Sequence, residues 1–463
     1  MSDPADQISN ARRLAGALAS AVAAGAAAAL APDGLRGAMA LLAGVAGLWL
    51  TRALPLPVTA LVVPVAAIAG GLATPAQALA PFANPVIFLF LGGFALAAAL
   101  QQQGLDVALA ARVKRLAGGR RLGSVLLLAG LTALLSMWMS NTATTAMVLP
   151  LALGLLADQG RDGGGGTIGE RERVFVLLAV AYSASIGGMA TLVGSPPNAI
   201  ASAQAGIGFA QWLAYGLPAA LLAWPLMLAL LAWRLKPQLR GRLAVSPAPP
   251  EDRVTWVWTP GRRATVAVFL LTVAGWLLGA PLAGALGLNA DTDALVALAA
   301  LVALVASGAL DWRALERSAP WGVLLLFGGG LSLSALMQAS GASAHLAALL
   351  FDAVAGWPAW LLLTAVIAFV VFLTEIVSNT ASAALLLPVL LPLAAELGLP
   401  AAGTAAAVAL AASCAFMLPV ATPPNALVYA TDQVPAAQML RQGLWLNGLA
   451  IGLITAMAGW LWT

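Results

Sequence analysis

The sequence predicts an all-α polytopic membrane protein, with about 11 transmembrane helices and two re-entrant helical hairpins arranged in two inverted-topology repeats. Of its 463 residues, 61% are hydrophobic and only 9% are charged, whereas a soluble domain carries about 25% charged residues. Uncharged apolar stretches of about 20 residues recur along the chain, which is the length a helix needs to cross a bilayer. So little polar surface excludes a soluble globular protein.

Eleven of the apolar stretches are predicted to cross the membrane as single helices. The first follows a short tail, and a second span begins directly after it, so we expect residues 1–35 to be an N-terminal tail and a retained first helix rather than a cleaved signal. The eleven predicted spans cover residues 14–30, 37–51, 57–73, 85–103, 174–192, 209–233, 264–281, 293–309, 320–338, 402–419 and 440–461.

Two further apolar stretches, 123–157 and 357–395, are each about twice as long as one span. A polar tripeptide interrupts each of them near its centre, Ser140-Asn141-Thr142 in the first and Ser378-Asn379-Thr380 in the second. Non-helical backbone at membrane depth is tolerated only where protein or an aqueous cavity surrounds it. Each stretch is therefore predicted to form a re-entrant helical hairpin with its tip near the middle of the bilayer.

The placement of lysine and arginine predicts the orientation of the chain. With a cytoplasmic N-terminus and hairpins that return to their own side, 21 of the 22 basic residues fall on the cytoplasmic side and only Arg36 lies outside. The C-terminus is then outside. The longest polar connection, residues 236–263, is predicted to be a cytoplasmic linker that divides the chain nearly in half.

The two halves repeat the same landmarks in the same order, which indicates a duplication. We assign residues 36–235 to repeat 1 and residues 264–463 to repeat 2. Gly92-Gly93 corresponds to Gly329-Gly330, the two Ser-Asn-Thr tips correspond at an offset of 238, and a Pro-Pro-Asn motif predicts a broken helix at 194–198 and again at 421–425. The first hairpin enters from the cytoplasm and the second from outside, so the repeats are predicted to be inverted.

The tips and the broken helices have a chemistry suited to ions. At a hairpin tip one helix ends with free carbonyls and another begins with free N–H groups, so a cation and an anion can each find partners there. Serine, asparagine and threonine cap such ends and add neutral oxygen ligands. Paired prolines stop a helix and leave further carbonyls free. A capped kink or a simple proline kink is the alternative interpretation, which the duplication makes less attractive.

With these motifs the chain resembles the divalent anion/sodium symporters, which carry di- and tricarboxylates or sulfate. The resemblance runs from about residue 35 to the end. It implies a first sodium site made by Ser136, Ser140, Asn141 and backbone oxygen of Gly194, and a second made by Thr374, Asn379 and backbone oxygens of Val377 and Ala421. It places the substrate carboxylates against Ser140, Asn141, Thr142, Ser378, Asn379, Thr380 and Thr422.

The expected function is therefore sodium-coupled secondary active symport that imports a small dianion, a C4 dicarboxylate such as succinate, malate or fumarate. The resemblance also implies a homodimer and elevator-type alternating access in the inner (plasma) membrane. Neither hairpin contains Arg or Lys, so bound sodium and helix dipoles would neutralise the dianion. The alternatives are a dicarboxylate exchanger or a sulfate carrier of the same fold.

Glu375 is the one acidic residue predicted inside a span, which makes it a functional candidate. We favour the interpretation that Glu375 is a hydrogen-bonding brace for the second hairpin. Two other roles stay open: a charge in a sodium site, or the proton acceptor of a proton-coupled symporter. An enzyme is not expected, because catalytic or metal-binding Cys/His chemistry would have to use Cys414 or His345, the single residues of each type. A nucleic-acid partner is not expected either, because the basic residues lie in short loops between apolar spans.

Overall fold

The computed structural model describes residues 4–116, 121–158, 169–238, 257–285, 292–353 and 356–460, and every regular element in these ranges is a helix. Six helical segments are long and apolar enough to cross a membrane. The predicted all-helical membrane fold is confirmed. The six segments are Asn10–Leu30, Pro75–Gln102, Phe209–Leu235, Pro260–Gly279, Trp321–Ala339 and Asn379–Glu396.

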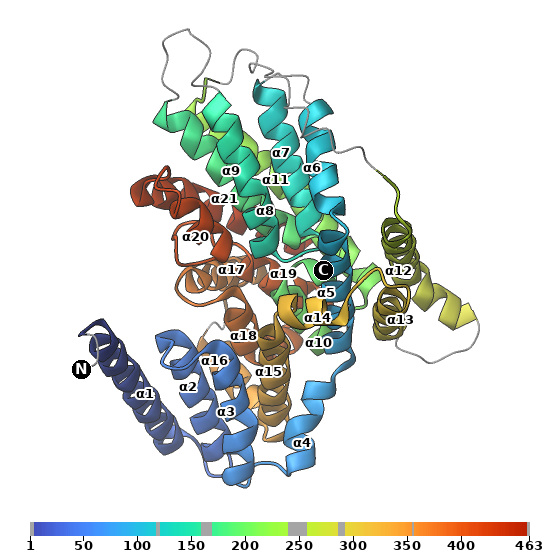
Figure 1. Ribbon diagram of the computed structural model, residues 1–463. Coiled ribbons are helices and arrows are strands. Elements are labelled where there is room, and N and C mark those ends of the chain that lie inside the picture. The colour runs from blue at the N-terminus through green and yellow to red at the C-terminus, as the bar shows by residue number, and fades with distance from the viewer. Residues whose placement is uncertain are drawn as a thin grey trace.

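The first half begins with α1 (Pro4–Leu30), which packs along α2 (Arg36–Thr51) at the edge of the molecule (Figure 1). The first hairpin is formed by α7 (Arg121–Ser136) and α8 (Asn141–Asp158). The other elements of this half are α3 (Leu56–Ala69), α4 (Pro75–Leu79), the 3-10 helix η1 (Ala80–Ala83), α5 (Pro85–Gln102), α6 (Leu105–Leu116), α9 (Glu170–Gly188), the 3-10 helix η2 (Leu192–Gly194), α10 (Pro196–Ala205) and α11 (Phe209–Leu235).

The second half repeats the order of the first, with α12 to α21 following one another as α2 to α11 do. Its hairpin is formed by α17 (Ala359–Ile376) and α18 (Asn379–Glu396). This shared order supports the proposed duplication. The remaining helices are α12 (Pro260–Ala285), α13 (Thr292–Ala306), α14 (Trp312–Ser318), α15 (Trp321–Ala339), α16 (Ala342–Ala353), α19 (Ala401–Ala412), α20 (Pro423–Tyr429) and α21 (Ala436–Trp460).

Several short helices do not correspond to any predicted span. The pairs α4 and α14, and α6 and α16, occupy matching places in the two halves. Each has 12 residues or fewer, and a helix of that length rises about 18 Å at most, too little to cross a bilayer. A search for spanning segments therefore passes over them.

The two halves interlock through symmetric helix contacts. Helix α5 packs against α13 and α15 packs against α3. The contacts are close because Gly92 and Gly329 carry no side chain: a Cβ at Gly92 would lie 2.5 Å from Ala297 O, and one at Gly329 would lie 2.5 Å from Ala60 O. Small residues allow this approach in membrane proteins, where the lipid supplies no hydrophobic drive for helices to associate.

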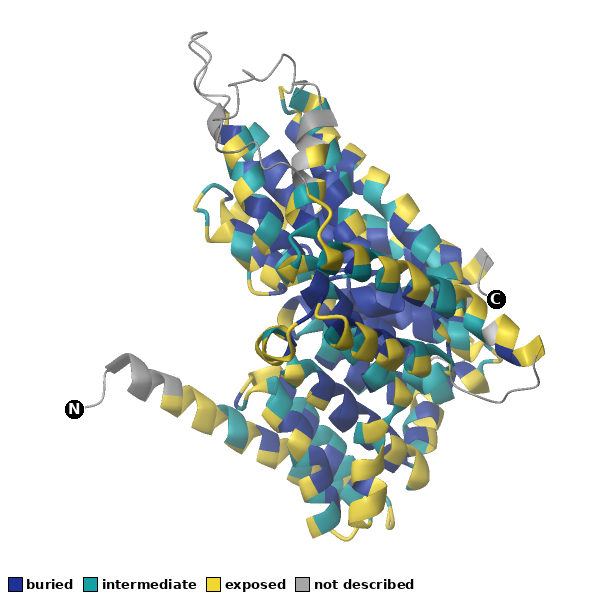
Figure 2. Ribbon diagram, turned by 45° about the vertical axis from the view of Figure 1, so that its right-hand side comes forward, coloured by how far each residue is buried: buried dark blue, intermediate teal, exposed yellow. Residues whose placement is uncertain are grey.

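A second symmetric exchange involves the hairpins. The short helix α10 of the first half packs against α18 of the second hairpin, and α20 of the second half packs against α8 of the first hairpin. Buried residues concentrate where these elements meet, in the middle of the molecule (Figure 2). The regions around the two hairpin tips are thus built by both halves together.

Two helices end earlier than the apolar spans predict. Helix α9 ends at Gly188 and α19 ends at Ala412, so the backbone of 189–195 and 413–422 is non-helical apart from the one turn of η2. The prolines of each Pro-Pro-Asn motif begin the next helix, at Pro196 and Pro423, where a missing N–H costs nothing. The breaks therefore precede the prolines instead of being centred on them.

The predicted orientation is testable by labelling. Single cysteines placed between Lys236 and Arg263 should react with an impermeant thiol reagent from the cytoplasmic side only, because basic loops stay inside. Cysteines near Ala342 should react from outside only. The native Cys414 is buried and should add little background. Reaction of both positions from the same side would refute the inverted arrangement. Residues 239–256 of this linker lie outside the described residues.

Candidate ion and substrate site

The first hairpin tip brings three oxygens together in one place. Ser136 Oγ, at the last residue of α7, lies 2.7 Å from Asn141 Oδ1 and 2.7 Å from Ala184 O of α9. A serine hydroxyl has one hydrogen to donate, and both neighbours are acceptors. Three oxygens therefore lie close together, and oxygen ligands are those that a small hard cation prefers.

Two glycines allow the backbone to pack closely against this oxygen cluster. A Cβ added at Gly188 would lie 2.3 Å from Asn141 Oδ1 and 2.9 Å from Gly194 O. A Cβ added at Gly194 would lie 2.6 Å from Gly188 O and 3.0 Å from Ser136 O. The structure thus brings together Ser136, Asn141 and Gly194, three of the four residues predicted for the first sodium site.

The second hairpin repeats the arrangement of the first. Thr374 Oγ1, in the last turn of α17, lies 2.8 Å from Asn379 Oδ1 and 2.8 Å from Ala412 O. Val377 and Ala421, the two predicted backbone ligands, are buried at the end of α17 and in the non-helical segment 413–422. The side-chain part of the second predicted site is therefore assembled in the same way as that of the first.

The asparagines of the two Pro-Pro-Asn motifs hold the non-helical segments in shape. Asn198 Nδ2 donates to Gly188 O at 2.9 Å and Thr191 O at 2.8 Å. Asn425 Nδ2 donates to the two carbonyls seven and ten residues before it, at 3.0 and 3.1 Å. Both amides are fully buried, and within the described part of the chain the Oδ1 of each has no hydrogen-bond partner. The duplication marks these asparagines in the sequence, but their role as donors is visible only in the structure.

The residues predicted to bind substrate differ in how they are placed. Ser140 and Ser378 cap the helices that follow them, accepting hydrogen bonds from the backbone N–H three residues on. Ser140 and Thr142 are exposed, whereas Thr380 is half-buried. Thr422 is buried and its hydroxyl accepts a hydrogen bond from Asn425 N. Ser140, Ser378 and Thr422 thus all cap helices, and of these three Ser140 is the exposed one.

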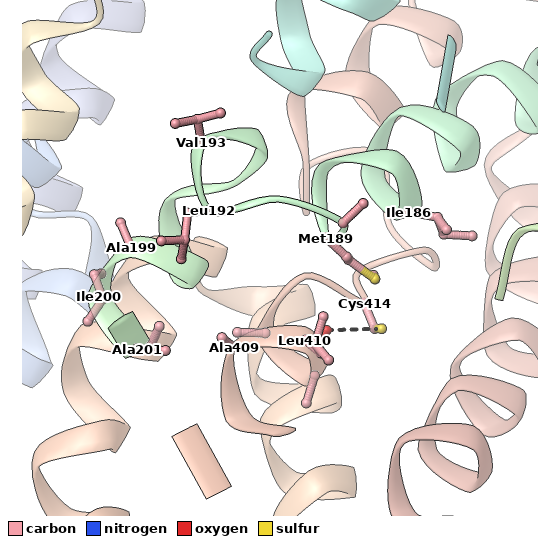
Figure 3. Packing of buried hydrophobic residues seen from close by; sticks show 14 of the residues in the cluster. Ile186, Met189, Leu192, Val193, Ala199, Ile200, Ala201, Ala409, Leu410 and Cys414 are labelled. Atoms are coloured by element: carbon pink, nitrogen blue, oxygen red, sulfur yellow. Dashed lines mark hydrogen bonds between the residues drawn. The ribbon is translucent and has the colours of Figure 1, made fainter. Parts of the chain in front are cut away.

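The two non-helical segments meet each other in the core. Ser195 Oγ and Ser413 Oγ are 3.4 Å apart, and Tyr182 Oη of α9 donates to Phe416 O at 2.7 Å. Figure 3 shows Met189 and Cys414, one from each segment, within the same apolar cluster, with the Cys414 thiol bonded to a carbonyl of α19. Cys414 therefore packs in the core.

Glu375 lies next to the second tip and binds the backbone of segment 413–422. Its Oε1 accepts hydrogen bonds from Phe416 N at 2.7 Å, Met417 N at 2.8 Å and Asn447 Nδ2 at 2.8 Å, and its Oε2 accepts one from Leu418 N at 3.1 Å. Three consecutive amides that have no helical partner are satisfied by one carboxylate. The Glu375 side chain is therefore a hydrogen-bonding brace that joins α17 to segment 413–422.

One basic side chain reaches the second tip from outside the hairpin. Arg52 ends α2 in a left-handed conformation, with φ of 52°, and its Nη2 donates to Ile376 O at 3.3 Å. A cation at the C-terminal end of α17 is favourable because the carbonyls there are the negative end of the helix dipole. The two residues are 324 positions apart, so the sequence alone gave no signal for this contact.

The family follows from comparison with known proteins. The family model described as citrate transporter (CitMHS) matches residues 46–412. The chain belongs to this transporter family. It is 31% identical over 439 residues to a protein of Staphylococcus saprophyticus named sodium-dependent dicarboxylate transporter SdcS, covering 89% of this chain and 83% of that protein. The resemblance to the divalent anion/sodium symporters is thereby confirmed.

Other members and neighbours agree with a transporter. An uncharacterized transporter of Haemophilus influenzae is 44% identical, covering 92% of this chain and 91% of the relative. The solved YdaH transporter of Alcanivorax borkumensis has a TM-score of 0.57 at 16% identity, covering 83% of this chain and 86% of that one, and at this identity the likeness shows the fold alone. As a member of this family the protein is a transporter and not an enzyme.

Proposed function

We propose that the protein is a sodium-coupled symporter that imports a C4 dicarboxylate such as succinate, malate or fumarate. The observation that carries the proposal is the pair of oxygen clusters at the hairpin tips, Ser136 with Asn141 and Thr374 with Asn379. Each cluster holds more acceptors than donated hydrogens, which suits a bound Na⁺ better than it suits an empty site. A relative of the same family is named a sodium-dependent dicarboxylate transporter.

Charge balance favours sodium as the coupling ion. An uncompensated buried ion costs several kcal/mol. Residues 123–157 and 357–395 contain no Arg or Lys to meet the charges of a dianion, and the Arg52 side chain that reaches the second tip is exposed. One sodium ion in each repeat would supply two positive charges and would order the tip that holds a carboxylate. Binding of ion and substrate would then be coupled, and the coupling would act in both directions.

The alternative of proton coupling through Glu375 is less favourable. The two carboxylate oxygens together accept four hydrogen bonds. A proton on either oxygen would point an O–H donor at groups that are themselves donors, which is unfavourable. We therefore propose that Glu375 acts as a hydrogen-bonding brace and not as a proton carrier. No observation favours an exchanger or a sulfate carrier over the symporter.

The proposed setting is the inner (plasma) membrane, with a cytoplasmic N-terminus and an external C-terminus. We propose a homodimer in which a transport part that carries both hairpins moves as an elevator against a scaffold. Symmetric contacts between the halves support the idea that the two hairpins move as one body, because α10 packs on α18 and α20 packs on α8.

The experiment that tests the proposal is uptake of labelled succinate into proteoliposomes. At constant pH, an inward sodium gradient should drive uptake at least about tenfold above the rate in choline buffer, because the substrate site gains its neutralising charge from sodium. Unlabelled malate and fumarate should compete, and sulfate and citrate should compete less. Uptake driven by a pH gradient in sodium-free buffer would instead establish a proton symporter, and preferential competition by sulfate would reassign the substrate.

A further inference from the structure

We propose that Glu375 is a positioning residue that builds the repeat 2 sodium site and makes it the tighter of the two sites. This inference rests on the proposed sodium coupling. Glu375 is only 3% exposed, and it follows directly after Thr374, whose hydroxyl contacts Asn379. Through three hydrogen bonds the carboxylate fastens α17 to the non-helical segment that supplies Ala421. A fourth, from Asn447 of α21, holds the carboxylate itself.

The corresponding junction in repeat 1 is made by different chemistry. Subtracting the offset of 238 from Glu375 gives Met137, and subtracting 227 from Leu418 gives Thr191. In repeat 1 the Thr191 hydroxyl donates to Met137 O. In repeat 2 the backbone N–H of Leu418 donates to the Glu375 side chain. Both repeats thus fasten the hairpin tip to the non-helical segment at equivalent positions, with one neutral bond in repeat 1 and a carboxylate in repeat 2.

The difference matters for a cation because the repeat 2 junction adds a negative charge. The first hairpin, residues 123–157, contains no acidic residue. A buried charge acts on its surroundings through a lower effective dielectric than water has. The Arg52 side chain that reaches Ile376 O is exposed, so solvent screens its positive charge. The buried carboxylate beside the repeat 2 tip therefore attracts Na⁺ more strongly than the neutral junction of repeat 1 does. Hydrogen bonds to an ionised group are also stronger than neutral ones, so this tip is held more firmly before the ion arrives.

The remaining partners of the carboxylate support a positioning role. Asn447, fully buried on α21, donates to Glu375 Oε1, and Tyr182 of repeat 1 fixes the same segment by donating to Phe416 O. Segment 413–422 is therefore held directly from α17 and α9, with three of its amides bonded to Glu375, while α21 holds the Glu375 carboxylate.

The test is sodium-induced thermal stabilisation of the purified full-length protein without substrate, with NaCl exchanged against choline chloride at constant ionic strength. Glu375→Gln replaces one acceptor oxygen with a donor amide that faces N–H groups. The half-stabilising sodium concentration should rise at least about tenfold, as expected when hydrogen bonds to a charged group are lost. The matched repeat 1 variant, Thr191→Val, removes a single neutral hydrogen bond and should raise it by about 2- to 12-fold, less than Glu375→Gln, which weakens several bonds to a charged group.

A purely structural role predicts a different result. In that case Glu375→Gln would lower the melting temperature in sodium-free buffer and leave the half-stabilising sodium concentration unchanged, which would overturn the proposal. If Glu375→Gln does not fold, Asn447→Ala decides: a rise in the half-stabilising concentration supports positioning, and an unchanged value refutes it. If sodium does not stabilise the wild type at all, the proposed sodium coupling is wrong. If sodium stabilises the wild type but Glu375→Gln and Thr191→Val raise the half-stabilising concentration equally, only the proposal about Glu375 is wrong.

Discussion

Gly188→Ala is expected to reduce sodium-driven uptake at least about tenfold while the protein still inserts into the membrane. The new Cβ would lie 2.3 Å from Asn141 Oδ1 and 2.9 Å from Gly194 O, a distance that no relaxed structure shows, so the amide or the backbone has to move. Overpacking of this kind costs about 1–3 kcal/mol. The displaced atoms are the proposed sodium ligands, so the loss should appear as a higher sodium requirement. Initial uptake rates across a series of sodium concentrations measure it.

Gly154→Ala is the matched control for this variant. Gly154 lies on α8 of the first hairpin, which packs against α9, the helix of Gly188. A Cβ at Gly154 would meet nothing within 4 Å. Alanine also favours a helix over glycine by about 1 kcal/mol, so folding should not suffer. We expect uptake by Gly154→Ala to equal that of the wild type. Equal loss in both variants would show that α8 and α9 simply tolerate no added methyl group, and normal uptake by Gly188→Ala would contradict the proposed repeat 1 cation site.

Asn141→Ala and Asn379→Ala are each expected to lower transport about 10- to 150-fold, the range set by about 1.5–3 kcal/mol for a lost contact to a charged group. Each substitution removes the amide oxygen that lies 2.7 Å from Ser136 Oγ in repeat 1 or 2.8 Å from Thr374 Oγ1 in repeat 2. Folding should persist, because both amides are only partly buried at helix N-termini. Uptake of labelled succinate, normalised to the amount of inserted protein, is the measurement.

The comparison with Thr142 separates ion ligands from tip residues in general. Thr142 follows Asn141 directly but is exposed. Thr142→Ser keeps the hydroxyl and should alter substrate half-saturation modestly, with the sodium dependence unchanged. Near-normal uptake by Asn141→Ala or Asn379→Ala, with unchanged sodium dependence, would exclude the corresponding asparagine from a binding role.

Local sequence pattern predicted the hairpins well. The tripeptides at 140–142 and 378–380 lie at the tips, and the hairpin helices begin and end within two residues of the predicted stretches. The reason is physical: a long apolar run with a central capping tripeptide has few other ways to satisfy its backbone in lipid. Helices such as α6 and α16 were missed because they are too short to span a membrane, and hydropathy detects spanning length.

The contacts that organise the site could not be predicted in the same way. Glu375 bonds to residues 41 to 72 positions away, and Arg52 reaches Ile376 across 324 positions. No periodicity relates such distant residues. The duplication did single out Asn198 and Asn425, but their role as donors to carbonyls seven and ten residues earlier depends on the path of the non-helical backbone.

The exchange of partners between α10 and α18, and between α20 and α8, bears on how such a chain could have arisen. In a single repeat standing alone, the short helix after the break would have no hairpin to rest on, and the hairpin would have no such helix. With the predicted inverted topology, a half-length ancestor could fill both places only by pairing with a copy of itself inserted upside down. After gene fusion the two copies could diverge. One result is a charged residue, Glu375, at the repeat 2 position that corresponds to Met137 in repeat 1.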